Sequence, residues 1–159
     1  MTPAINLAKK ASISYQIHEY THDPAHASYG LEAAEKMAVA PARVFKTLVV
    51  LLDTKELVVG VVPVAVTLNM KQIARAAGAR KAGMAPAADV QRSSGYVLGG
   101  VSPLGQKKRL RTFIDSSAQQ FSTMFVSAGR RGLEIELTPG DLGRLTSGTF
   151  ADLADNESQ

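Results

Sequence analysis

Apolar and polar residues recur along this chain at the periods of short strands and short helices, without internal repeats or a linker. Residues 13–20 alternate with a period of two, which places Ile13, Tyr15 and Ile17 on one face of a strand and His18 on the other. Similar patterns predict further strands at residues 47–52, 57–64, 109–115, 123–126 and 133–137.

Capping residues and turns complete this pattern. Thr2 can cap a helix that Pro3 opens, and Asn69 can cap one that Gly78 ends. Helices are also expected at residues 31–38, at residues 86–92 and after Thr138-Pro139. Strands outnumber long helices, and the polar turn at residues 53–56 predicts a hairpin. We therefore expect an α/β fold with a mixed, mainly antiparallel sheet rather than a doubly wound parallel one.

The composition narrows the class of protein. The 159 residues suit one domain, residues 1–154, followed by a frayed tail, residues 155–159. There is no cysteine, which excludes disulfides, thiolate metal sites and a cysteine nucleophile. No apolar stretch reaches membrane-spanning length and the N-terminus lacks a secretory pattern, so we expect a soluble cytoplasmic protein. The net charge of +4 is compatible with a polyanionic partner without requiring one.

A glycine-rich loop runs directly into a cluster of cations at residues 94–109. Gly100 and Gly105 have the spacing of the phosphate-binding loop of nucleotide hydrolases, but Gln106 stands in place of its lysine. What remains is a Gly99-x-x-x-Pro103 turn, whose backbone N–H groups could face an anionic ligand. A tight surface connection would show the same pattern, so the loop alone does not define a site.

Lys46 lies in the apolar run of residues 44–52, where a strand is expected. Burying an unpaired ammonium is costly, so this lysine either reaches the surface or points into a pocket. Thr47, Ser102 and Ser127 invite a nucleophile hypothesis, but the chain has no G-x-S-x-G elbow and no evident histidine with an orienting carboxylate. Ordinary hydroxyl hydrogen bonding explains these residues better.

The three histidines do not predict a metal site. His18, His22 and His26 are spaced by four, which would align them on a helix. However, His18 lies in an alternating strand and Pro24 interrupts the segment. We therefore expect neither a metal nor another cofactor.

Several segments of the chain together resemble those of one family. They are Met1-Thr2-Pro3-Ala4, Tyr20-Thr21-His22-Asp23-Pro24, Phe45-Lys46-Thr47-Leu48, Ser94-Gly95-Tyr96, the stretch from Gly99 to Arg109, and residues 126–133. On these motifs the chain resembles the prolyl-tRNA editing superfamily, most closely its free-standing YbaK/EbsC-type Cys-tRNA(Pro) deacylases. The resemblance implies a mixed sheet curled towards a barrel with helices around it. Ala128 stands where glycine is common and Glu134 where aspartate is familiar, and neither is expected to touch the chemistry.

The resemblance also implies roles for individual residues. Lys46 would be the essential catalytic group, holding the terminal phosphate or the ester of the substrate electrostatically. The substrate-binding residues would be Tyr20, Thr47, Gly99, Gly100, Val101, Ser102, Pro103, Ser127 and Gly129. Phosphates of tRNA would meet Lys107, Lys108, Arg109, Arg130 and Arg131, although a solvated basic face would have the same composition.

The activity implied by the resemblance is trans-editing, the release of cysteine from mischarged Cys-tRNA(Pro) and also from Cys-tRNA(Cys). The substrate's own thiol would attack its carbonyl, so the protein would need no nucleophile and no cofactor. The partners would be the aminoacylated acceptor end of tRNA and prolyl-tRNA synthetase, with no DNA and no membrane. Two alternatives stay open: a deacylase for another ester such as Ala-tRNA(Pro), and a non-catalytic module that binds a nucleotide or an RNA end.

Overall fold

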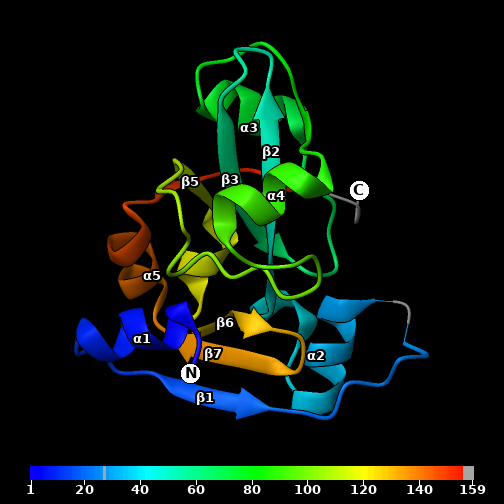
Figure 1. The fold of residues 1–159 in the computed structure, drawn as a ribbon, viewed down its shortest axis with the longest axis vertical. Helices are drawn as coiled ribbons and strands as arrows, with labels where there is room; N and C mark the ends of the chain where they lie inside the picture. The colour runs from blue at the N-terminus through cyan, green and yellow to red at the C-terminus, as the bar shows by residue number, and fades with distance from the viewer. Residues whose placement is uncertain (27, 156–159) are drawn as a thin grey trace.

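The computed structural model describes residues 1–26 and 28–155, which form two β-sheets flanked by helices (Figure 1). The strands are β1 (Gln16–Glu19), β2 (Phe45–Leu52), β3 (Leu57–Pro63), β4 (Ala82–Met84), β5 (Thr112–Asp115), β6 (Met124–Arg130), β7 (Leu133–Leu137) and β8 (Thr149–Ala151). The helices are α1 (Pro3–Lys10), α2 (Tyr29–Met37), α3 (Met70–Ala76), α4 (Ala87–Ser94) and α5 (Pro139–Thr146), with 3₁₀ turns η1 (Pro41–Arg43) and η2 (Ser116–Gln120). No helix in this part of the chain is both long enough and apolar enough to cross a membrane.

Antiparallel pairing is the more frequent kind over the two sheets together. The three-stranded sheet has the order β1-β7-β6 and is antiparallel throughout. In the five-stranded sheet, of order β4-β2-β3-β5-β8, β2 pairs antiparallel with β3 and β4, while β5 runs parallel to β3 and β8. This confirms the mixed, mainly antiparallel α/β fold. Curling towards a barrel stays a prediction, because hydrogen bonding divides the strands into two sheets, linked by an isolated bridge between Val44 and Phe125.

One apolar cluster joins the two sheets. Val61 of β3 and Ile114 of β5 belong to it together with Met124 of β6 and Ile135 of β7, and α1 and α5 contribute further residues. A second cluster packs α3, through Ile73, against the five-stranded sheet. In Figure 1, α3 accordingly lies along the β2–β3 hairpin, whereas α1 lies beside the three-stranded sheet.

Helix α2 covers the place where the sheets meet. Ala33 and Ala34 pack with Val44 and Phe125, the two residues of the bridge. The first turn of α2, the start of β2 and one face of the three-stranded sheet therefore converge there. The candidate site lies at this junction.

The observed helix ends follow the predicted caps. Thr2 accepts the N–H of Ile5 at 3.2 Å at the start of α1, and the side chain of Asn69 accepts that of Gln72 at 3.0 Å at the start of α3. Asp155, expected in the frayed tail, instead accepts a hydrogen bond from Asn69 Nδ2 at 2.7 Å. The rest of the expected tail, residues 156–159, lies outside the described residues.

Candidate active site

A cavity of about 470 Å³ opens at the start of β2, between α2, the loop at residues 98–101 and the three-stranded sheet. Its lining includes these predicted site residues: Tyr20, Lys46, Thr47, Gly99, Val101, Ser127 and Arg131. They come from β2, β6, the loops around β1 and β7, and the glycine turn. The fold therefore brings together residues that are far apart in the sequence.

Lys46 is the ammonium group of this cavity. In β2 it stands opposite Val62 of β3, beside the buried Phe45. Within the described residues its side chain makes no ion pair or hydrogen bond, and burial lowers its pKa because loss of water disfavours the charged form. A cation without a counter-ion from the protein is suited to pair with an anionic group of a ligand.

Glu134 lines the same cavity, although the comparison with the family's motifs did not lead us to expect it at the reacting groups. Its neighbours in β7, Leu133 and Ile135, belong to the core, so Glu134 faces the other way, with Ser127 opposite it in β6. Burial raises the pKa of Glu134 to about 8, which favours the protonated carboxyl at neutral pH. The alternation of residues 133–137 could have predicted this position, because in a strand it puts Glu134 on the face away from the core.

The raised pKa of Glu134 makes the stability of the unliganded protein depend on pH. A carboxyl whose pKa is higher in the folded than in the unfolded chain stabilises the fold fully below its ordinary pKa of 4.5. This stabilisation is lost as the pH rises through the folded pKa of about 8. We expect Glu134→Gln to be more stable than the wild type at about pH 9, with the difference vanishing towards about pH 5. Urea unfolding across this range measures the difference, and parallel pH profiles would contradict the expectation.

The glycine turn is shaped by close contacts with its neighbours. Gly99 has a φ of +91°, and a Cβ there would lie 2.7 Å from Cε2 of Tyr29. At Gly100 a Cβ would lie 2.8 Å from the Cα of Arg130, and the Gly100 N–H donates to the carbonyl of Val97 at 3.0 Å. This N–H, predicted to face the substrate, is therefore used within the turn.

The close approach at Gly100 predicts a loss of stability on substitution. Because a Cβ would meet backbone atoms of Arg130, which cannot rotate away, Gly100→Ala should destabilise the fold by about 1–3 kcal/mol. Gly83→Ala in β4 is the matched control, because no atom lies within 4 Å of its added Cβ. We expect Gly83→Ala to change the free energy of unfolding by less than about 0.5 kcal/mol. Equal unfolding curves for the two variants would refute this packing.

Ser102, Pro103 and Gly129, also predicted to bind substrate, do not line the main cavity. Ser102 is fully buried, and its hydroxyl accepts the N–H of Leu104 at 3.2 Å. Pro103 lines a separate cavity of about 210 Å³. Gly129 has a φ of +115°, and its N–H donates to the hydroxyl of Ser127 at 3.2 Å. Of the residues of the glycine turn, Gly99 and Val101 line the main cavity.

The hydroxyl groups of the cavity are not activated by a histidine. Thr47 Oγ1 is buried and has no hydrogen-bond partner in the described residues, and Ser127 accepts the Gly129 amide. His18, His22 and His26 each pair with a glutamate, which the sequence did not reveal. Because none of these pairs reaches a cavity hydroxyl, residues 1–26 and 28–155 present no serine triad. No group of side chains suited to holding a metal is found in the same residues.

The predicted tRNA-binding cations lie in several places. Lys107 is exposed and lines neither the main cavity nor the separate one. Lys108 and Arg109 line the separate cavity beside Pro103. Arg130 is exposed and lies 3.5 Å from the carboxylate of Glu19. Arg131 lines the main cavity, so it is the member of the set that lies at the candidate site.

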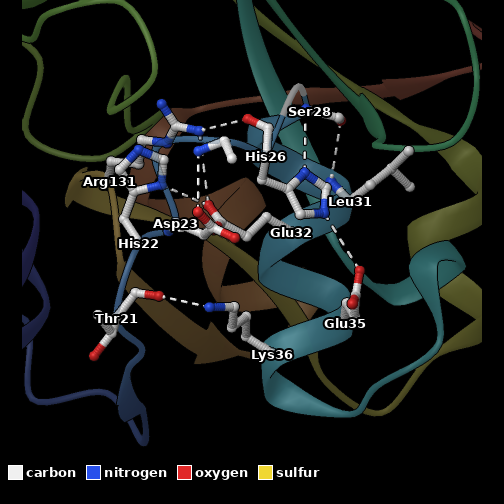
Figure 2. Close-up of polar contacts among 11 residues, drawn as sticks. Thr21, His22, Asp23, His26, Ser28, Leu31, Glu32, Glu35, Lys36 and Arg131 are labelled. Atoms are coloured by element: carbon white, nitrogen blue, oxygen red, sulfur yellow. Dashed lines mark hydrogen bonds and ion pairs between the residues drawn. The ribbon is translucent and has the colours of Figure 1, made fainter.

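Arg131 is held by a buried carboxylate, as Figure 2 shows. The fully buried Glu32 contacts His22 Nδ1 at 2.8 Å, accepts the Asp23 N–H at 2.6 Å and lies 3.7 Å from Arg131. Burial opposes ionisation of Glu32, but the hydrogen bonds from Asp23 and His22 outweigh it and hold the pKa below its usual value. The guanidinium of Arg131 lies over the ring of Tyr29, 3.3 Å from its centroid. Neither Glu32 nor Tyr29 was predicted as a site residue.

The same fold occurs in solved structures. One is described as "Crystal structure of a putative trans-editing enzyme for prolyl tRNA synthetase"; it aligns with a TM-score of 0.84 and 21% identity, covering 97% of this chain and 96% of that one. Among curated proteins, "Putative Cys-tRNA(Pro)/Cys-tRNA(Cys) deacylase EbsC" of Enterococcus faecalis is 36% identical over 156 residues, 98% of this chain and 94% of that protein. "Uncharacterized protein YwhH" of Bacillus subtilis is 29% identical over 72% of this chain and 73% of its own length.

The family model of the aminoacyl-tRNA editing domain matches residues 23–145. This range includes Lys46, the glycine turn, Arg131 and Glu134. The chain therefore belongs to the aminoacyl-tRNA editing domain family, as its motifs predicted.

Proposed function

We propose that this protein is a trans-editing deacylase that releases cysteine from mischarged Cys-tRNA(Pro), and also from Cys-tRNA(Cys). Membership of the editing family and 36% identity to a relative with that name support an aminoacyl ester as substrate. The observation that carries the proposal is one cavity with a cation and a carboxyl on different walls, neither of which has a protein counter-ion in the described residues.

An aminoacyl ester at the end of RNA matches this distribution of charge. Its α-ammonium would pair with Glu134, and binding it would favour the ionised carboxylate. Tyr20 and Glu134 line the same cavity. Burial and the nearby Glu134 raise the pKa of Tyr20, so its hydroxyl would stay protonated and could donate a hydrogen bond to the substrate. Lys46 would face the terminal phosphate or the ester oxygen, where negative charge develops.

The substrate would supply the nucleophile that the cavity lacks. The cysteinyl sulfur attacks its own carbonyl carbon, the C–O bond to the ribose breaks, and the ribose oxygen takes the proton lost by the thiol. The products are tRNA and a thiolactone, which water then opens to cysteine. Positioning of the two reacting groups and stabilisation of the oxyanion are sufficient roles for the protein.

Two further parts of the proposal concern the partner and the place of action. The described residues hold the editing fold and no recognisable module that reads an anticodon, so prolyl-tRNA synthetase is proposed as the partner that selects the tRNA. The protein would act in the cytoplasm, where tRNA is charged, and would need no cofactor.

The test compares release of amino acid from Cys-tRNA(Pro), Ala-tRNA(Pro) and Pro-tRNA(Pro). We expect rapid loss of the cysteinyl ester and at most slow loss of the other two. Faster release of alanine would replace the proposal with an alanine-specific editor. Binding without release of any amino acid would leave a non-catalytic module that holds an RNA end.

A further inference from the structure

The mouth of the cavity exposes apolar groups. Tyr29, Val97 and Leu98 are 47%, 59% and 61% exposed, and Tyr29 and Leu98 line the cavity itself. Large apolar side chains left in water at the entrance of a charged cavity indicate a surface that a ligand covers. The proposed deacylation gives these exposed side chains no role.

The ring of Tyr29 is fixed in place from several sides. Arg131 covers one of its faces at 3.3 Å from the centroid, and the absence of a Cβ at Gly99 allows the ring edge to pack closely on the glycine turn. Arg131 is in turn held by Glu32 at 3.7 Å and by the carbonyl of His26 at 3.3 Å, as seen in Figure 2. A ring that is rigid on one side and nearly half exposed is suited to stacking, because ordering it on binding costs little entropy.

The charges around the mouth favour a polyanion over a protein surface. Lys46 and Arg131 line the cavity, and Arg130 lies beside the glycine turn, where its exposed pair with Glu19 is weak. In an aminoacylated RNA, the amino acid and the terminal base are attached to the same ribose. When the ester occupies the cavity, the base is therefore only one ribose away, within reach of the apolar groups at the mouth.

We propose that Tyr29, flanked by Leu98, is a stacking platform for the unpaired terminal nucleobase of the RNA. This inference rests on the proposed function and deepens it, since it names the part of the substrate that the apolar rim recognises. Aromatic side chains bind unpaired bases by stacking with little dependence on sequence. The platform would thus contribute to recognition of any tRNA end and would not select the tRNA.

The experiment uses an uncharged single-stranded RNA that ends in CCA, with 2-aminopurine in place of the terminal adenine. Stacking quenches 2-aminopurine, so the wild type should quench its fluorescence on binding. Tyr29→Leu keeps apolar bulk against Gly99 and Arg131 but has no aromatic face, and it should weaken binding about 5- to 150-fold. Tyr29→Trp should retain binding. Leu31→Ala, an exposed residue on the same helix outside the cavity lining, should bind as the wild type does.

A second readout separates stacking from a general structural effect. For deacylation, Tyr29→Leu should raise KM by a similar factor and leave kcat nearly unchanged. The inference would be overturned if Tyr29→Leu bound the RNA as tightly as the wild type does. It would also be overturned if Tyr29→Leu kept RNA binding and lost only binding to prolyl-tRNA synthetase. Failure of the proposed function is distinguishable, because it would abolish ester release in the wild type while quenching that depends on Tyr29 remained.

Discussion

Replacing Lys46 with methionine is expected to lower kcat/KM for release of cysteine from Cys-tRNA(Pro) by about 10²- to 10³-fold. The reason is the loss of the one ammonium among the described residues that lines the cavity, which we propose faces the ester oxygen where negative charge develops. Single-turnover release measured at protein concentrations well below saturation gives kcat/KM and tests the prediction without interference from product release.

The same substitution should not weaken the fold. The Lys46 ammonium is partly buried and lacks a protein counter-ion in the described residues, so its removal relieves a desolvation cost. We expect the free energy of unfolding to stay constant or to rise, while activity falls. Lys71→Met on the exposed surface of α3 is the matched control and should leave both quantities unchanged. Loss of stability and activity together in Lys46→Met would indicate a structural lysine instead.

Replacing Glu32 with alanine should give the largest loss of stability, about 3–5 kcal/mol. Its fully buried carboxylate satisfies His22, the Asp23 amide and Arg131, and alanine would leave these groups without their acceptor. Urea unfolding near pH 7 measures the change. Glu35→Ala is the control on the same helix, because the side chain of Glu35 is 74% exposed and contacts His26 at its surface. This variant should lose less than about 1 kcal/mol.

The contribution of Glu32 should also depend on pH. Its pKa is lowered in the folded protein, so the stabilisation is complete above the ordinary value of 4.5 and is lost as the pH falls through the lower folded value. The difference in stability between the wild type and Glu32→Gln should therefore shrink as the solution is acidified below about pH 4. A constant difference would show that Glu32 is not ionised in the folded chain.

The sequence predicted those parts of the fold that depend on local signals. The caps at Thr2 and Asn69 and the β2–β3 hairpin follow from residues close together in the chain. It missed β4 and β8, which have three residues each and no alternation of their own. These strands exist because β2 and β5 offer them hydrogen-bonding edges.

The candidate site was predicted only where a motif marked it. Lys46, Thr47 and Gly99 belong to such motifs, and the structure places them in one cavity. Glu32 and Tyr29 were missed because their roles come from contacts with Arg131, about a hundred residues later in the chain. No local pattern distinguishes a fully buried glutamate in a polar helix from an exposed one.

The most direct test of thiol-assisted release compares single-turnover release of amino acid from Cys-tRNA(Pro) and from the same tRNA charged with serine. The two esters differ by sulfur in place of oxygen, so both fit the cavity, but the thiol is the far better nucleophile. If the cavity positions the ester and the substrate supplies the attack, cysteine should be released about 100-fold faster or more. Equal rates for the two esters would contradict this mechanism, because water or a protein group would then perform the attack.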